Sequence, residues 1–198
     1  MKNTLKDENY IEAATVLDLE PAVVKAVIDV ETGGRGSFVA PGKPIILFEG
    51  HVFWQRLKLY GMTPMDYMRG NEEILHQEWT RRYYRGGLKE YDRLERAVKI
   101  HRTAALESTS WGLFQIMGFN YGKCGCGDVL EFVDRMSESA KEQLLLWVRF
   151  MQHEGLDECL RRHKWALFAL RYNGRGYKAN RYDKLIEKAY IRYKSSNM

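Results

Sequence analysis

The chain contains 198 residues, of which 45% are hydrophobic and 13% are aromatic. This composition excludes a disordered protein, and the length suits one hydrophobic core, so we expect a single domain over residues 1–198. No apolar run approaches the roughly 20 residues that are needed to cross a bilayer. The start of the chain also lacks the apolar core and cleavage site of a secretory signal. We therefore expect the protein to be cytoplasmic when it is synthesised.

The net charge of +5 is unevenly distributed along the chain. Residues 161–198 contain eleven Lys and Arg residues against Asp183 and Glu187, a local charge of +9 that leaves −4 for residues 1–160. Such a basic segment favours an anionic partner, for example nucleic acid, a membrane surface or a charged envelope polymer. The alternative is a helix face whose charges are only solvated.

Three cysteines, Cys124, Cys126 and Cys159, bear on the compartment and on metal binding. Cys124 and Cys126 are too close in sequence for an easy mutual disulfide, and no C-x-x-C pair is present to form a zinc knuckle. We expect reduced, structural thiols, and the sequence implies no metal and no organic cofactor.

The first strong pattern is a helix at Asp18 to Gly34, which follows a short helix at residues 10–17. Asp18 suits an N-cap, Pro21 is tolerated in a first turn, and Gly33 with Gly34 suits a C-terminal stop. Valine and isoleucine recur between these ends at helical spacing and give the helix one apolar face.

Glu31 falls on the apolar face of this predicted helix, close to its end. Burial disfavours a charged carboxylate, so the pKa of Glu31 should be raised and the group could hold a proton near neutral pH. A glycosidase obtains its general acid in this way. The alternative is a Glu that reaches solvent at a frayed helix end or pairs with Arg35.

The middle of the chain alternates loops, one short strand and several helices. The apolar run Pro44 to Phe48 predicts a buried strand that ends at Glu49. Ser108 to Ser110 resembles a cap before an inner helix at residues 111–121, and residues 118–127 are expected to form a loop. Periodicity predicts further helices at residues 51–59, 72–84, 89–106, 130–136, 141–154, 156–163 and 165–172. We expect a mainly α (α+β) fold, with residues 141–154 as the central core helix and a small β element after the Glu31 helix.

Four ordered motifs together resemble a known family. They are VETGG ending at Gly34, ILFEGH at Ile46 to His51, SWGLFQIMGFNY at Ser110 to Tyr121, and YNGRGY at Tyr172 to Tyr177. They are similar to the motifs of the N-acetylmuramidase domain of bacteriophage endolysins, a member of the lysozyme-like superfamily. Goose-type lysozymes and soluble lytic transglycosylases carry similar motifs. The resemblance spans most of the chain and implies a lysozyme-like fold.

The resemblance also implies roles for individual residues. Glu31 matches the catalytic acid of the family, which the helix pattern singled out independently. Tyr172 and Asn173 match a pair that faces this acid. The segment that lines the saccharide cleft is matched by Ser110, Gly112, Gln115 and Ile116. Gly112 would let the sugar approach the backbone, while an N-cap for Ser110 and a core amide for Gln115 are the structural alternatives. The family often has Pro where this chain has Arg175.

Glu49 is open to two interpretations. It could be the second carboxyl group of the reaction, or the structural partner of an arginine. We interpret His51 and His101 as structural histidines. Trp54, Trp79 and Trp111 should mostly belong to the core, although one or two could stack on sugar rings.

The function expected from this resemblance is cleavage of the β-1,4 bond between N-acetylmuramic acid and N-acetylglucosamine in peptidoglycan. The enzyme would be a monomer that waits in the cytoplasm and reaches the cell wall after release. Its basic C-terminal segment, residues 161–198, would then hold an anionic envelope surface. A lytic transglycosylase, which uses one Glu and forms an anhydro sugar, is the nearer alternative. A non-enzymatic, basic helical protein that binds nucleic acid is the remoter one, and it leaves Glu31 on an apolar face without explanation.

Overall fold

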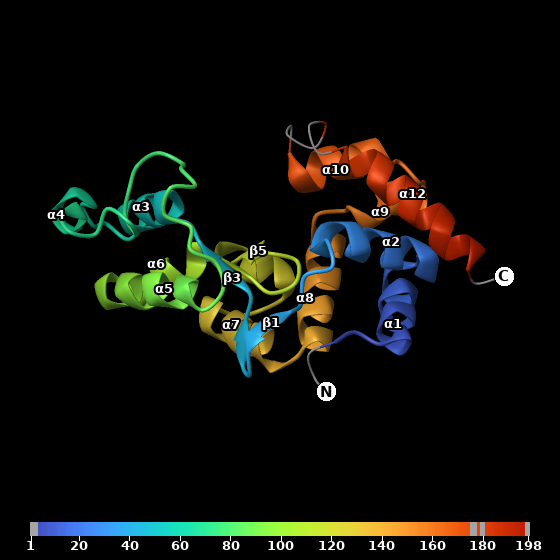
Figure 1. Ribbon diagram of the computed structural model, residues 1–198, viewed down its shortest axis with the longest axis horizontal. Helices are drawn as coiled ribbons and strands as arrows, with labels where there is room; N and C mark the ends of the chain where they lie inside the picture. The colour runs from blue at the N-terminus through green and yellow to red at the C-terminus, as the bar shows by residue number, and fades with distance from the viewer. Residues whose placement is uncertain (1–3, 175–177, 179–180, 197–198) are drawn as a thin grey trace.

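Helices make up most of the chain in the computed structural model, which describes residues 4–174, 178 and 181–196 (Figure 1). Two small antiparallel sheets complete it, one of β1 and β2 and the other in the order β3-β4-β5. The strands are β1 (Phe38–Ala40), β2 (Lys43–Pro44), β3 (Ile46–Phe48), β4 (Thr109–Trp111) and β5 (Ile116–Met117). The helices are α1 (Asp7–Leu17), α2 (Pro21–Thr32), α3 (Gly50–Leu59), α4 (Met65–Met68), α5 (Lys89–Ile100), α6 (Arg102–Glu107), the 3-10 helix η1 (Gly118–Cys124), α7 (Val129–Glu138), α8 (Ala140–His153), α9 (Asp157–Arg161), α10 (Trp165–Asn173) and α12 (Tyr182–Ser195).

The helix that carries Glu31 begins later than its sequence predicts. Asp18 is the C-cap of α1 with φ at 53°, and α2 begins at Pro21 with Glu20 as its N-cap. The prediction of Asp18 as an N-cap was therefore wrong. Proline at the first helical position is favourable because its missing N–H has no helical acceptor there. Gly33 ends α2 in the left-handed conformation, as predicted.

The inner helix predicted for residues 111–121 is instead a β-hairpin followed by η1. Strand β4 pairs with β3, Leu47 opposite Ser110, and β5 pairs with the other edge of β4. Gly112 and Gln115, in the turn between β4 and β5, have φ of 70° and 50°, which no right-handed helix contains. The predicted loop at residues 118–127 was also wrong over its first part, which forms η1.

Two more helix predictions were wrong, both for segments between β3 and β4. Residues 72–84 form turns rather than a helix, and the predicted helix 89–106 is broken at His101, whose side chain caps α6. The buried pair Glu90 and Arg93, 2.8 Å apart, explains the turns. Glu90 accepts the backbone N–H groups of Arg85 and Gly86, and Arg93 donates to the Glu73 carbonyl. The Glu73 carbonyl lies at the start of the segment and the two N–H groups directly follow its end, so side chains rather than a helix satisfy the backbone at both ends.

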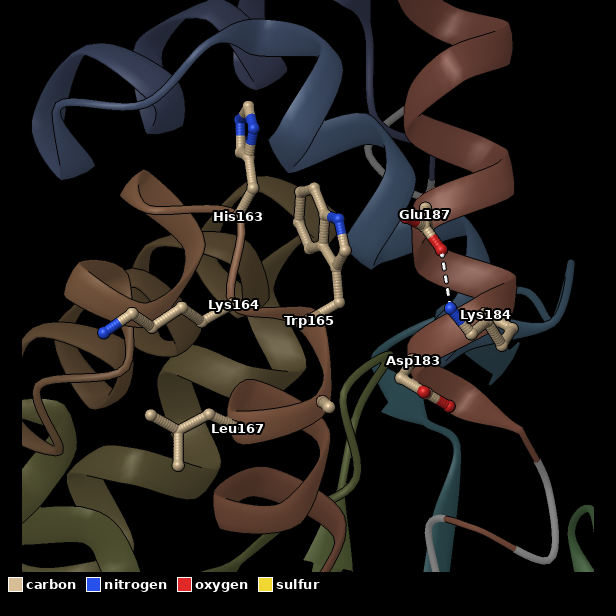
Figure 2. Close-up of a pocket in the computed structure, with 8 residues that line it drawn as sticks. His163, Lys164, Trp165, Leu167, Asp183, Lys184 and Glu187 are labelled. Carbon is tan, nitrogen blue, oxygen red and sulfur yellow. Dashed lines mark hydrogen bonds and ion pairs between the residues drawn. The ribbon is translucent and has the colours of Figure 1, made fainter.

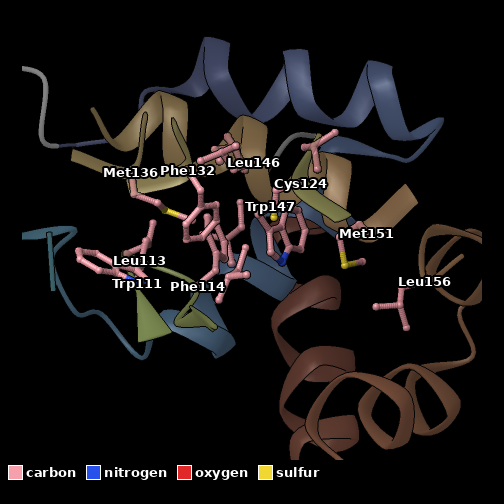
Figure 3. Packing of buried hydrophobic residues seen from close by; sticks show 14 of the residues in the cluster. Trp111, Leu113, Phe114, Cys124, Phe132, Met136, Leu146, Trp147, Met151 and Leu156 are labelled. Carbon is pink, nitrogen blue, oxygen red and sulfur yellow. The ribbon is translucent and has the colours of Figure 1, made fainter. Parts of the chain in front are cut away.

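The hydrophobic core surrounds α8, the helix predicted to be central (Figure 3). Trp147 of α8 is fully buried and stacks on Phe114 with 4.9 Å between ring centroids. The three cysteines are free and buried, as expected for structural thiols. None of the described helices has both the length and the apolar character that crossing a bilayer requires.

The C-terminal helix α12 packs against α2 and α10, so both ends of the chain contribute to one lobe (Figure 1). Arg192 lies 2.6 Å from Asp29 of α2. The hydroxyl of Tyr190 donates a hydrogen bond to Glu20. Glu20 also forms an ion pair with Lys194 at 3.2 Å. These contacts anchor the helix that carries Glu31.

Candidate active site

A cleft of about 490 Å³ lies where α2 and α10, in the lobe that contains both ends of the chain, face the β3-β4-β5 sheet of the other lobe. It brings together six of the seven residues that the sequence predicted for the site, together with Ile116. Arg175, whose role the sequence left open, lies outside the described residues. The lining consists of Glu31, Arg35, Leu47, Glu49, Ser110, Phe114, Gln115, Ile116, Met117, Asn120, Phe150, Tyr172, Asn173 and Tyr182.

Glu31 is a buried carboxyl group at the C-terminal end of α2, with 9% of its surface exposed. Burial raises its pKa from 4.5 to about 7, although a hydrogen bond from Asn173 and the charge of Arg35 act in the opposite direction. The Asn173 amide donates to Glu31 Oε1 at 3.1 Å. Arg35 is occupied with the backbone carbonyls of Glu31 and Thr32 and makes no direct ion pair with the carboxylate among the described contacts.

Tyr172 occupies the α10 side of the cleft, beside Asn173. The indole N–H of Trp147 donates to its hydroxyl at 3.2 Å, and its ring stacks on Phe168. Burial raises the pKa of Tyr172, and the nearby Glu31 raises it further, so the phenol stays protonated. Because the Tyr172 oxygen already accepts a hydrogen bond, the hydroxyl can use its own proton to donate a hydrogen bond into the cleft.

Ser110 and Gln115 line the cleft, and they also bond to each other. The Ser110 hydroxyl donates to Gln115 Oε1 at 3.0 Å, and the Gln115 amide donates to the carbonyls of Gly112 and Ile45. These bonds close the hairpin and hold Gln115 in its left-handed conformation. Both side chains therefore have a structural task in addition to any contact with a saccharide.

Gly112 does not line the cleft, which corrects the reason given for its small size. A Cβ at this position would lie 2.8 Å from the side chain of Gln143 and 3.0 Å from the sulfur of Met136, both on the core side. Its φ of 70° also disfavours any side chain. The glycine is thus required by close packing and by the turn rather than by the approach of a sugar.

Glu49 lies at the opposite wall of the cleft, immediately after β3. The hydroxyl of Tyr84 donates to Glu49 Oε2 at 2.7 Å, and His51 Nδ1 lies 3.4 Å from the same oxygen. Among the described residues Glu49 has no arginine partner, so the structural ion pair considered from the sequence is not formed. The hydrogen bond and the ion-pair contact both involve Oε2, which leaves Oε1 as the oxygen that can accept a hydrogen bond from water.

Sequence reasoning missed Tyr84 and Tyr182 as residues of this region. Tyr84 reaches Glu49 from the irregular segment that was predicted to be helical, and burial is the largest cause that raises its pKa. Tyr182 begins α12 and lines the cleft from a helix whose limits the sequence did not indicate. No local pattern marks either tyrosine, because each meets the cleft only through the tertiary fold.

A second hollow, of about 390 Å³, lies where the turn before α10 faces α12 (Figure 2). Its carboxylate Glu187 pairs with Lys184 at 3.0 Å, and His163 stacks on Trp165. Its carboxylates therefore belong to a surface ion pair and to the first turn of α12, away from the cleft that contains Glu31. Residues 4–174, 178 and 181–196 contain no cluster of side chains that could hold a metal ion.

Comparison with known proteins agrees with the motifs and the geometry. The sequence model of the N-acetylmuramidase family matches residues 20–194. The crystal structure of an endolysin from Burkholderia phage AP3 is similar, with a TM-score of 0.89 and 38% sequence identity, over 98% of this chain and 72% of that chain. No curated protein matches the sequence. The chain therefore belongs to the N-acetylmuramidase family and is a peptidoglycan-degrading glycoside hydrolase with a lysozyme-like, mainly α fold.

Proposed function

We propose that the protein hydrolyses the β-1,4 bond between N-acetylmuramic acid and N-acetylglucosamine, with Glu31 as the general acid. The observation that carries this proposal is the pKa of about 7 for a buried carboxyl group in the large cleft. At neutral pH a substantial fraction of Glu31 is protonated, and the group is still acidic enough to transfer its proton.

In this mechanism Glu31 protonates the glycosidic oxygen while the bond from that oxygen to the anomeric carbon breaks. A water held by Glu49 attacks the anomeric carbon and gives its proton to the Glu49 carboxylate. Asn173 holds Glu31 Oε1 in place, and it stabilises the carboxylate that forms after proton transfer. Tyr172, which stays protonated, donates toward the same region.

The second carboxylate favours hydrolysis over the transglycosylase alternative. A lytic transglycosylase uses the hydroxyl of its own substrate as the nucleophile and requires no group that activates water. Glu49 lies in the same cleft as Glu31 and is anchored through only one of its oxygens. Mass spectrometry of the products formed from purified peptidoglycan tests this choice. Hydrolysis gives reducing muropeptides, whereas products lighter by one water would establish the transglycosylase.

We further propose that the basic C-terminal segment, residues 161–198, binds an anionic envelope surface and that the enzyme acts on the bacterial cell wall in host lysis, as an endolysin does. Part of the positive charge is neutralised internally, by the pairs of Arg192 with Asp29 and Lys194 with Glu20. Lys164, Arg181 and Lys188 are exposed and form no ion pair within the described part of the chain. These three cations support the proposal because they remain available to an external partner.

Reversing these charges should weaken attachment to envelopes without affecting the chemistry. The triple variant Lys164→Glu, Arg181→Glu and Lys188→Glu is expected to pellet several-fold less with cell envelopes at low ionic strength. The difference should disappear at high salt, which screens exposed charges.

A matched control reverses three exposed lysines of the other lobe, Lys58, Lys89 and Lys99, and changes the net charge equally. Hydrolysis of soluble muropeptides should be unchanged in both triple variants. If the two variants pellet equally well, the position of the charge is irrelevant and the basic C-terminal segment is only a solvated face.

A further inference from the structure

The C-terminal end of α2 borders two hollows, and Arg35 lines both of them. One is the cleft that contains Glu31. The other, which we call the side hollow, has a volume of about 360 Å³ and lies between α2, α1, α12 and residues 34–35. Four residues on one face of α2 line it, at the helical spacing i, i+3, i+4 and i+7: Lys25, Ile28, Asp29 and Thr32. Arg35 therefore stands between the cleft and a second space, whose volume falls within the range of about 300–1,000 Å³ that is usual for ligand sites.

Arg35 is held in place at the end of α2 but keeps donors for a ligand. Its Nε group donates to the Thr32 carbonyl at 2.9 Å, and its Nη2 group donates to the Glu31 carbonyl at 3.0 Å. Both acceptors belong to the last turn of α2, where carbonyls have no helical N–H partner. A guanidinium carries five N–H groups in one plane. The two bonds to α2 use two of them, so the remaining three can point toward a ligand.

Arg35 also carries the unpaired charge at the junction of the two hollows. In the side hollow Lys25 pairs with Asp7 at 2.8 Å, and Asp29 pairs with Arg192 at 2.6 Å. Arg35 is exposed and forms no ion pair within the described part of the chain. Among the described residues that line the cleft it is the only cation, and the other charged groups there are carboxyl groups. An anionic group that enters at the junction would therefore be attracted to Arg35.

The remaining walls of the side hollow suit a short peptide. The rings of Tyr10 and Tyr193 line it. Each ring lies close to a paired cation, with Lys25 at 5.7 Å from the centre of Tyr10 and Arg192 at 4.8 Å from the centre of Tyr193. Phenol groups and paired charges of both signs offer donors and acceptors to amide groups and to charged side chains.

We propose that the side hollow holds the peptide attached to N-acetylmuramic acid, and that Arg35 binds a carboxylate of this peptide. The inference rests on the proposed function, since it requires the glycan to lie in the cleft. Peptidoglycan carries its peptide on the lactyl group of N-acetylmuramic acid, so the peptide leaves the glycan within a few atoms of a ring bound beside Glu31. The two oxygens of a carboxylate match the parallel N–H groups of a guanidinium.

The test compares the binding of three tetrasaccharides by titration calorimetry, in a Glu31→Gln background that prevents cleavage. The first is the dimer of N-acetylglucosaminyl-N-acetylmuramic acid with its peptides attached. The second is the same dimer after an amidase has removed the peptides, and the third is chitotetraose. The peptide-bearing dimer should bind roughly tenfold more tightly than either of the others, which corresponds to about 1.4 kcal/mol and is typical of a charged hydrogen-bonded pair.

Substitutions of Arg35 test the source of this preference. Arg35→Gln removes the charge and should reduce the preference to within about twofold. Arg35→Lys keeps the charge but loses the planar fork, so it should retain only part of the preference. Arg102→Gln removes an exposed arginine of α6 that has no ion pair among the described residues, and this control should keep the full preference. Circular dichroism of each variant ensures that folded proteins are compared.

Chemical-shift mapping provides a readout that depends on no substitution of Arg35. In the isotope-labelled Glu31→Gln protein, the backbone amides of Lys25, Asp29 and Gly34 should respond to the peptide-bearing dimer, because these residues line the side hollow. They should not respond to chitotetraose.

The outcomes separate the inference from the function. If the three tetrasaccharides bind equally, or if the amides of the side hollow do not respond to the peptide, the peptide site is wrong. It is also wrong if the dimer without peptides binds as tightly as the peptide-bearing one, since Arg35 would then recognise the lactyl carboxylate. Equal weakening of all three ligands by Arg35→Gln would place Arg35 in the glycan site alone and would likewise overturn the inference. The proposed function fails separately, if the parent binds none of the three ligands and the wild-type enzyme releases no muropeptides.

Discussion

Glu31→Gln is expected to reduce peptidoglycan hydrolysis by roughly 100-fold or more, because the amide keeps the shape of the carboxyl group but cannot donate its proton. The loss should appear in kcat, measured by muropeptide release from purified peptidoglycan. Glu95→Gln, an exposed change in α5, should leave the rate unchanged. Hydrolysis by the Gln variant at the wild-type rate would refute the assignment of the acid.

The same substitution should also change stability, in a direction that depends on pH. The pKa of Glu31 is about 7 in the folded protein and 4.5 ordinarily. The folded state therefore holds the proton more tightly, and this carboxyl group lowers stability as pH rises from 4.5 to 7. Above pH 7 the ionised Glu31 lowers the free energy of unfolding by roughly 3 kcal/mol. Thermal melting should show Glu31→Gln to be several degrees more stable than wild type at pH 8, and equally stable near pH 4.

The pH dependence of activity follows from the same group. Because Glu31 must be protonated, kcat/KM should fall as pH rises through about 7. Asn173→Ala removes a hydrogen bond that lowers the pKa of Glu31. The alkaline limb of the kcat/KM profile of this variant should therefore move to higher pH. An alkaline limb that stays in place would mean that another group controls it.

Glu49→Gln should lower turnover about as strongly as the change at Glu31, if Glu49 activates the attacking water. In inverting glycosidases the two carboxyl groups stand about 6.5–9.5 Å apart to admit a water, against about 5–5.5 Å in retaining ones. We predict an inverting reaction with Glu49 as the base or water-positioning group. NMR of the first product should show the α-anomer, and an initial β-anomer would reject inversion.

Melting temperature separates this role from a structural one. Glu49→Gln should melt close to wild type, because one oxygen of an amide can still accept the Tyr84 hydrogen bond. If instead the variant melts much lower but remains active per folded molecule, Glu49 is structural. Tyr84→Phe should reduce kcat several-fold by releasing the carboxylate, whereas Tyr83→Phe, beside it in sequence, should not.

The parts of the site that the sequence predicted depend on local patterns. Glu31 followed from the spacing of apolar residues along one helix, which is independent of the rest of the fold. The Tyr172 and Asn173 pair and the hairpin residues Ser110 and Gln115 followed from motifs. Their placement around one cleft agrees with those predictions, while their roles toward a substrate remain proposals.

The parts that were missed depend on contacts between distant segments. Residues 72–84 have helical periodicity, but Arg93 binds the Glu73 carbonyl and Glu90 binds the N–H groups that directly follow the segment, which folds as turns. Tyr84 therefore meets Glu49 through a contact that no local pattern indicates. The hairpin at β4 and β5 was missed for a related reason, since its apolar density resembles a buried helix when periodicity alone is considered.

The packing of α12 on α2 also sets how the cleft is assembled from the two ends of the chain. These helices lie about 150 residues apart in sequence, so their contact closes a very long loop, and such contacts form slowly. Tyr182 at the start of α12 lines the same cleft as Glu31 of α2. The wall that both helices form is therefore complete only when the far end of the polypeptide has docked.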